Sequence, residues 1–261
     1  MIKRILYITF WVLSVLALLS FEVYALRKNG NTPCKKLSIE LKNKNNYPLL
    51  TSPVELRTEL LENHDPIEGQ KIKNLNLEHI ENNVGQIAYL KNYNTYFTID
   101  GDLVLKASPR KAIMRVYNQA GQHFYLGEDN VVMPLSSQHR LRLLLANGAL
   151  PKLKMDYFKQ SRNDTLVLPD IYKKIYILAA KIQKDEFLNA LIDEIYIKTN
   201  QEIELIPKTG VNYIEFGDTN NLENKLKRLK IFYIKGKEKI DWSIYKSINL
   251  EYKNQVVCTK K

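Results

Sequence analysis

An uncharged apolar stretch near the N-terminus constrains this chain more than any other feature. No charged residue occurs from Ile5 to Phe21, and the apolar stretch continues past Glu22 to Leu26. A helix rises about 1.5 Å per residue, so this stretch extends about 33 Å, enough to cross a hydrocarbon core about 30 Å thick. The sequence therefore predicts a transmembrane helix over residues 5–26, preceded by a cytoplasmic tail of residues 1–4.

The charges around this stretch bear on its orientation. Lys3 and Arg4 precede it, which favours a cytoplasmic N-terminus, although basic residues follow it as well. A cleaved signal peptide is the alternative, with Val23-Tyr24-Ala25 as a small-x-small cleavage site, but the apolar part of a signal peptide is usually only about 7–15 residues long. Either interpretation places the rest of the chain outside the cytoplasm.

The composition indicates one large or two small globular domains behind that segment. The formal net charge is +11, but both signs are spread along the chain. The basic run from Lys225 to Lys230 has helical spacing and predicts a solvated helix face; a basic excess also suits acidic lipid headgroups or an acidic partner. No motif indicates nucleic-acid binding. The two cysteines, Cys34 and Cys258, are far apart, so we expect free thiols.

Residues 37–108 predict a small α+β module in the order β-α-α-β-β. Alternation over residues 37–41 predicts a half-buried strand. The capping box Ser52-Pro53-Val54-Glu55 starts one helix and Asn76 a second. Two alternating segments around the turn Asp100-Gly101 then predict a hairpin.

Residues 111–261 predict a second domain that is rich in strands. Two amphipathic helices stand out, one after Pro169-Asp170 and one after Asn220. The final strand is predicted from about Tyr245 to Cys258. The fold class expected for the chain is therefore α+β, with the last strand at a sheet edge.

The sequence contains no recognisable active site. The four histidines show no metal-ligand spacing, and no CxxC or glycine-rich phosphate loop occurs. Ser136 and Ser137 lie near His139, but the motifs of serine hydrolases are missing, and a turn is the plain interpretation. We therefore expect no catalytic residue, no cofactor, no metal and no small-molecule substrate.

The C-terminal strand offers a binding edge instead. Exposed edges are either protected or recruit a further strand from a partner. Lys246, Lys253 and Lys260 are charges of the kind that protect an edge, so protection alone is a second interpretation.

Several segments of the second domain resemble one family. The matching residues, in chain order, are Arg115-Val116, Gly121, Tyr125, Met133-Pro134-Leu135-Ser136, Glu204-Leu205-Ile206-Pro207, Gly210, Ile214, Gly217, Lys225-Leu226, Leu229-Lys230, Phe232-Tyr233, Asp241-Trp242, Ile248-Asn249-Leu250-Glu251-Tyr252 and Gln255-Val256-Val257-Cys258. In their order and spacing they resemble the bacterial cell-division family FtsQ/DivIB, in a Bacteroidetes-like branch. The β-α-α-β-β module is similar to that family's POTRA domain, so the resemblance covers the whole chain.

This resemblance implies a non-enzymatic scaffold of the divisome. It implies a single-pass protein of the inner membrane at the division septum, with its C-terminal domain in the periplasm, that joins FtsB and FtsL and helps control the septal peptidoglycan synthase FtsW–FtsI. FtsB is expected to add a strand to the last strand of the β-domain. The partner-binding residues carried over by position are Leu250, Glu251, Tyr252, Lys253, Asn254 and Gln255.

The sequence departs from the family's best-known members at two places, one among these residues and one nearer the end of the chain. Glu251 stands where they have a basic residue, and Lys260 stands near the place of a tryptophan. The reversed charge implies a partner whose matching residue is basic. A core position for Tyr252, beside Ile248 and Leu250, is the other interpretation of that residue.

Two other functions are compatible with the same pattern. One is a POTRA-containing envelope assembly or secretion factor without a division role, which septal localisation would distinguish. The other is a membrane-anchored envelope hydrolase, which the lack of a nucleophile, metal set or acid pair disfavours.

Overall fold

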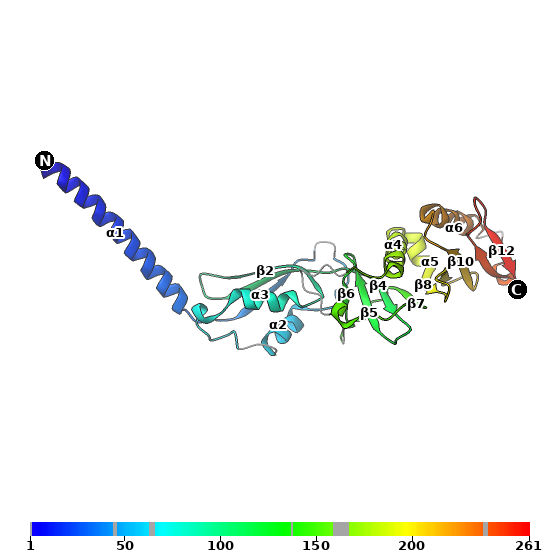
Figure 1. Cartoon of the computed structure of the whole chain (residues 1–261), viewed down its shortest axis with the longest axis horizontal. Helices are drawn as coiled ribbons and strands as arrows, with labels where there is room; N and C mark the ends of the chain where they lie inside the picture. The colour runs from blue at the N-terminus through cyan, green and yellow to red at the C-terminus, as the bar shows by residue number, and fades with distance from the viewer. Residues whose placement is uncertain (1, 44–45, 63–65, 137, 159–166, 237–239) are drawn as a thin grey trace. The chain divides into compact units, whose positions relative to one another are not determined.

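The computed structural model describes residues 2–43, 46–62, 66–136, 138–158, 167–236 and 240–261. The chain divides into two compact units (Figure 1). The first comprises Met1–Lys44, Ser52–Gly85 and Leu90–Pro109; the second comprises Asn45–Thr51, Gln86–Tyr89 and Arg110–Lys261.

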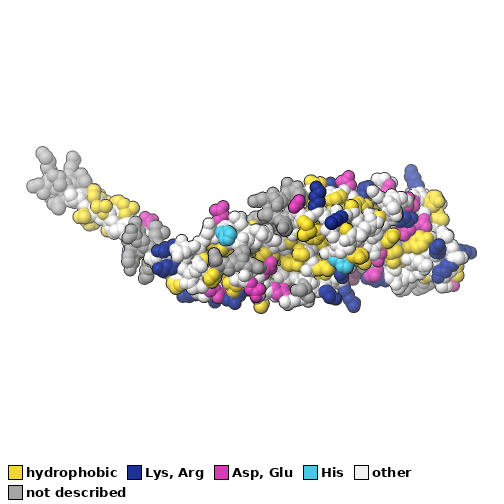
Figure 2. Space-filling view, turned by 60° about the horizontal axis from the view of Figure 1, so that its bottom comes forward, with side chains coloured by type: hydrophobic (Ala, Val, Ile, Leu, Met, Phe, Trp, Pro, Cys, Tyr) yellow, Lys and Arg dark blue, Asp and Glu magenta, His cyan; other side chains and the backbone are white. Residues whose placement is uncertain are grey.

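The chain begins with the long helix α1 (Ile2–Asn31). Side chains are described for Tyr7 and residues 9–22 of this helix, and nearly all of them are exposed, including Phe10, Trp11 and Phe21. Figure 2 shows these apolar side chains gathered along the middle of the helix. Within the described part of the chain, no helix combines the length and the apolarity needed to cross a membrane. The predicted span over residues 5–26 is therefore not confirmed.

The first unit contains a three-stranded sheet with two helices. Its elements are β1 (Leu37–Leu41), α2 (Pro53–Glu62), the 3₁₀ turn η1 (Ile72–Asn74), α3 (Leu77–Gly85), β2 (Leu90–Phe97) and β3 (Leu103–Pro109). The strand order is β1-β3-β2, with β1 parallel and β2 antiparallel to β3. The capping box forms as expected, because Ser52 N–H donates to Glu55 Oε2 (2.8 Å) and Glu55 N–H donates to Ser52 Oγ (3.3 Å).

The second unit is built on a nine-stranded mixed sheet. The order across the sheet is β12-β11-β10-β9-β8-β7-β4-β5-β6. The strands are β4 (Ala112–Tyr117), β5 (His123–Gly127), β6 (Val132–Met133), β7 (Leu144–Gly148), β8 (Ile192–Ile197), β9 (Ile203–Pro207), β10 (Tyr213–Gly217), β11 (Tyr245–Asn249) and β12 (Val257–Lys260). The chain is thus a mixed α+β protein, as its sequence predicts, and the structure adds that the strands of the second unit form one large sheet.

Three helices pack with these strands in one core: α4 (Asp170–Lys184), α5 (Glu186–Leu191) and α6 (Leu222–Gly236). The remaining helical turns of this unit are η2 (Met155–Phe158) and η3 (Trp242–Ile244). The buried faces of α4 and α6 are the predicted ones, since both helices bury apolar residues spaced three or four positions apart. The buried residues of these two stripes are Ile171, Ile175, Leu178, Ile182, Leu222, Leu226, Leu229 and Tyr233.

The basic run of α6 differs from its prediction. Lys225 is buried rather than solvated, because its Nζ donates to the carbonyl oxygens of Phe216 (2.9 Å) and Asp218 (3.0 Å) and to Asp218 Oδ1 (2.9 Å). Lys230 is half-buried and pairs with Asp185, the N-cap of α5, at 2.6 Å. Lys227 remains exposed. The basic run is therefore only partly solvated, because two of its lysines hold α6 to neighbouring segments of the same unit.

The predicted single C-terminal strand is wrong. It is two antiparallel strands, β11 and β12, joined by a turn at residues 250–256. Asn254 in that turn has a φ of 59°, a left-handed conformation that asparagine tolerates better than most residues. The strand β11 ends at Asn249, although the apolar–polar alternation of the sequence continues to Lys253.

Candidate protein-binding edge

One edge of the large sheet is formed by β12, and β6 forms the other. Strand β12 lies at the end of the strand order and pairs only with β11 among the described strands. It is four residues long, and Val257, Thr259 and Lys260 are exposed. A sheet edge of this kind is a template for a further strand.

Hydrogen bonds already made by β11 show which groups of β12 face outward. Leu250 N–H donates to Glu215 of β10 (2.9 Å), and Lys246 C=O accepts from Asn212 (3.0 Å), so the even-numbered residues of β11 point toward β10. Because backbone groups alternate along a strand, Ser247 and Asn249 point toward β12. Their register partners Thr259 and Val257 therefore face back, as Lys261 does when its N–H donates to Ile244 (3.0 Å). The backbone groups of Cys258 and Lys260 consequently face the open side.

The turn before β12 is held by a single side chain of α6. The guanidinium of Arg228 donates to the carbonyl oxygens of Leu250 (2.8 Å), Tyr252 (2.6 Å) and Gln255. Charge-assisted hydrogen bonds from a planar fork fix both position and orientation. Arg228 therefore holds the turn that precedes β12.

Replacing Arg228 with methionine is expected to loosen this hairpin locally. Loss of charged donors to the turn costs about 1.5–3 kcal/mol, so the inward-facing amides of Val257 and Thr259 should exchange with solvent about 10–100 times faster. Hydrogen exchange followed by NMR or mass spectrometry measures this. Lys227→Met, on the exposed side of the same helix, should leave the rates unchanged. If these amides exchange as slowly in Arg228→Met as in wild type, the hairpin does not depend on Arg228.

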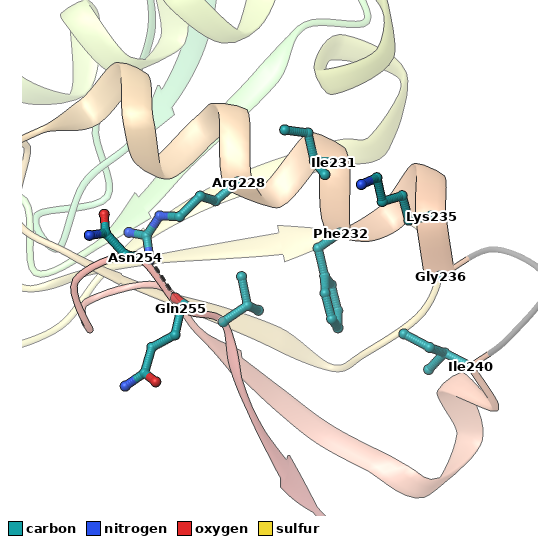
Figure 3. A pocket seen from close by; sticks show the side chains of 9 residues that line it. Arg228, Ile231, Phe232, Lys235, Gly236, Ile240, Asn254 and Gln255 are labelled. Atoms are coloured by element: carbon teal, nitrogen blue, oxygen red, sulfur yellow. Dashed lines mark hydrogen bonds between the residues drawn. The ribbon is translucent and has the colours of Figure 1, made fainter.

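A groove of about 520 Å³ lies between α6 and this turn (Figure 3). Ile231 and Phe232 of α6, together with Ile240 beyond the helix, give it apolar walls; Asn254, Gln255 and Val256 form the side toward the turn. The positive charges at the groove belong to Arg228 and Lys235. An added strand at β12 would have this apolar, basic groove beside it.

The aromatic residues behind the groove are packed against one another. Trp242 stacks on Tyr233 with ring centroids 4.6 Å apart and meets Phe232 edge to face at 5.7 Å. Gly236 permits this arrangement, since a β-carbon there would lie 2.6 Å from Ile240 and 3.2 Å from Trp242. The wall of the groove is therefore a fixed surface.

Lys225 anchors the strand-to-helix connection that leads to the groove. Its hydrogen bond lowers the pKa of the Asp218 carboxyl below its usual value. Its ammonium group also lies 5.1 Å from the centroid of the Phe216 ring, a cation–π distance. The buried lysine fixes the start of α6 against β10.

The residues predicted to bind a partner do not form a strand; they occupy the turn between β11 and β12. Leu250 is fully buried in the core, so its side chain is not available at the surface. Tyr252 is not the core aromatic of the other interpretation, because it is 52% exposed. Glu251 folds back near Gly217: a β-carbon there would lie 2.5 Å from Glu251 Oε2. The exposed members of the predicted set are Glu251, Tyr252, Lys253, Asn254 and Gln255.

Two features of this surface escaped the sequence prediction. The open edge is β12, which lies after the predicted residues, and the groove depends on α6, whose contacts with the turn are distant in sequence. The sequence contained one local indication of the turn between β11 and β12, because Lys253-Asn254 is a polar pair of the kind that forms turns.

Cys258 and Cys34 are free thiols in different units, and burial raises the pKa of both thiols, which disfavours the reactive thiolate. Among the described residues, no group of three or more histidine, cysteine, aspartate or glutamate side chains is arranged to hold a metal ion.

Comparison with known proteins identifies a family match over the second unit. Residues 111–259 match the family model described as FtsQ/DivIB, C-terminal related. The match covers the large sheet from β4 to β12. Curated proteins give no match to the chain.

Proposed function

The chain belongs to the FtsQ/DivIB family, and from this premise we propose that it is a non-enzymatic scaffold of the cell-division machinery that binds an FtsB/FtsL-type partner outside the cytoplasm. In this role it links early and late division proteins and helps control septal peptidoglycan synthesis by an FtsW/FtsI-type synthase. The family is one of non-enzymatic division scaffolds, which agrees with a surface suited to binding.

The open edge of β12 is the observation that carries the proposal. The partner adds one antiparallel or parallel strand there, bonding to the outward backbone groups of Cys258 and Lys260. So short an edge supplies few main-chain hydrogen bonds, so side chains must provide much of the affinity. Tyr252, exposed in the turn beside it, is the best placed aromatic anchor.

The groove beside α6 accommodates an apolar side chain of the same partner. Arg228 and Lys235 favour carboxylates near that side chain, whereas Glu251 favours a basic residue at the turn. The partner segment that fits this surface has an apolar anchor, an acidic group near the groove and a basic group near Glu251.

The membrane anchor is part of the proposal. The exposed apolar side chains of α1 support a single span over residues 5–26, with the N-terminus in the cytoplasm and the chain after residue 26 in the periplasm. Residues 37–108 then form a POTRA domain that helps recruit the protein to the septum; the element order of the first unit supports this.

Co-purification of the full-length chain with the FtsB- and FtsL-type proteins of the same organism tests the proposal. Wild type should retain both partners, and Tyr252→Ala should weaken retention about tenfold or more, because aromatic anchors at interfaces are worth about 2 kcal/mol or more. Tyr196→Ala removes an exposed tyrosine from β8, distant along the sheet from β12, and serves as the matched control. Absence of wild-type binding, together with uniform distribution around the cell envelope, would favour an assembly or secretion factor instead.

A further inference from the structure

A second hollow of about 510 Å³ lies in the large sheet at a different place from the β12 edge. None of its lining residues belongs to α6, β11 or β12. Its wall is polar and carries three cationic side chains, from Arg115, Arg142 and Lys208, together with the amides of Gln183 and Asn189.

The sheet order brings these cations together from distant parts of the sequence. Arg115 lies in the middle of β4, Arg142 precedes β7 and Lys208 follows β9. These strands are close neighbours in the order β9-β8-β7-β4. The neighbours of Arg115 in sequence, Met114 and Val116, are buried in the core, so alternation directs the Arg115 side chain to the other face of the sheet.

The positive charge in this hollow is only partly compensated. Among the described residues, none of the three cations takes part in an ion pair. Asp193 is the single carboxylate in the wall, so positive charge exceeds negative by two. Three cations that share one hollow repel one another, and an anion between them would remove that repulsion.

The side chain of Arg115 gives a more specific indication that a ligand is missing here. Its Nε is buried and has no hydrogen-bond acceptor within the described structure. Buried donors without acceptors are rare in folded proteins, and a missing ion or ligand is one of the usual reasons. Gln183 is held in place by donating its Nε2 to Ile113 C=O (2.6 Å), so this part of the wall is fixed before a ligand arrives.

We propose that this hollow binds the carboxylate or phosphate group of a small molecule. The guanidinium of Arg115 receives the oxyanion, and Arg142 and Lys208 supply charge from the rim. The site is distinct from the β12 edge and goes beyond the scaffold function, since it gives the β-domain a small-molecule ligand of its own.

Calorimetric titration of the full-length chain with inorganic phosphate, and separately with citrate, tests this proposal at fixed ionic strength. Wild type should show saturable binding at one site for at least one of the two anions, and the anion that saturates identifies the group. Arg115→Lys keeps the charge but loses the guanidinium fork, so it should weaken binding at least tenfold. Arg142→Gln/Lys208→Gln changes two exposed side chains, which leaves folding intact, and should weaken binding similarly.

Lys152→Gln/Lys227→Gln is the matched control, because it removes the same charge from exposed positions outside the hollow. It should change affinity less than twofold. If the control pair loses as much anion affinity as the hollow variants, the anions are attracted only by the overall positive charge of the protein. If neither anion shows saturable binding, the hollow does not bind an oxyanion. Either result overturns the proposal.

Discussion

Replacing Lys260 with proline is expected to weaken partner binding about tenfold while the hairpin stays folded. The N–H of Lys260 faces the open side of β12, so proline removes a donor that only an added strand uses. One such hydrogen bond is worth about 1–1.5 kcal/mol, and 1.4 kcal/mol corresponds to a factor of ten in affinity. Surface plasmon resonance with the FtsB-type partner measures the change.

Thr259→Pro is the matched control one residue away. The N–H of Thr259 faces β11, so proline there should open the hairpin and raise the exchange rates of neighbouring amides, even without a partner. Together the two variants distinguish a loss of partner binding at the open side of β12 from an opening of the hairpin itself. If Lys260→Pro binds like wild type, the partner does not add a strand at β12.

Replacing Leu250 with alanine is expected to lower the free energy of unfolding by about 2–5 kcal/mol, the range for a leucine removed from a packed core. Leu250 is fully buried with Ile248 and Phe216, and its N–H donates to Glu215. Denaturant unfolding followed by tryptophan fluorescence suits the measurement, since Trp242 packs in the same region. Tyr252→Ala should change stability by less than about 0.5 kcal/mol.

The comparison of these two residues decides what the turn contributes to binding. If Leu250→Ala leaves stability unchanged, its side chain is not part of the core. If Tyr252→Ala destabilises the protein as strongly, the tyrosine is a packing residue, and its effect on co-purification would no longer indicate an interface.

Local chemistry in the sequence was sufficient to predict most elements. The capping box at Ser52 and Glu55 forms with both reciprocal hydrogen bonds. The apolar stripes of α4 and α6 are buried as their spacing indicates, because helical periodicity directly reports the face that leaves water. The short helix α5 was missed, since six residues are too few to show a period.

The candidate surface was predictable only in part, because its geometry depends on contacts far apart in the sequence. Alternation through Ile248, Leu250 and Tyr252 indicates one continuous strand, but the turn at Asn254 is held by Arg228. The sequence predicts Lys225 on a solvated face. In the structure it is buried, and its ammonium group donates hydrogen bonds to carbonyl groups of the segment before α6. These contacts join residues that are not neighbours in the sequence, so no pattern among neighbouring residues indicates them.

The open edge also bears on self-association. Two copies of the chain pairing through β12 would bring two lysines, one Lys260 from each copy, to a shared edge only four residues long. The register shift between Tyr245 and Ser247 adds local twist to the neighbouring strand, which spoils the flat surface that stacking of identical edges requires. The edge can thus stay open to a further strand without the chain polymerising through it.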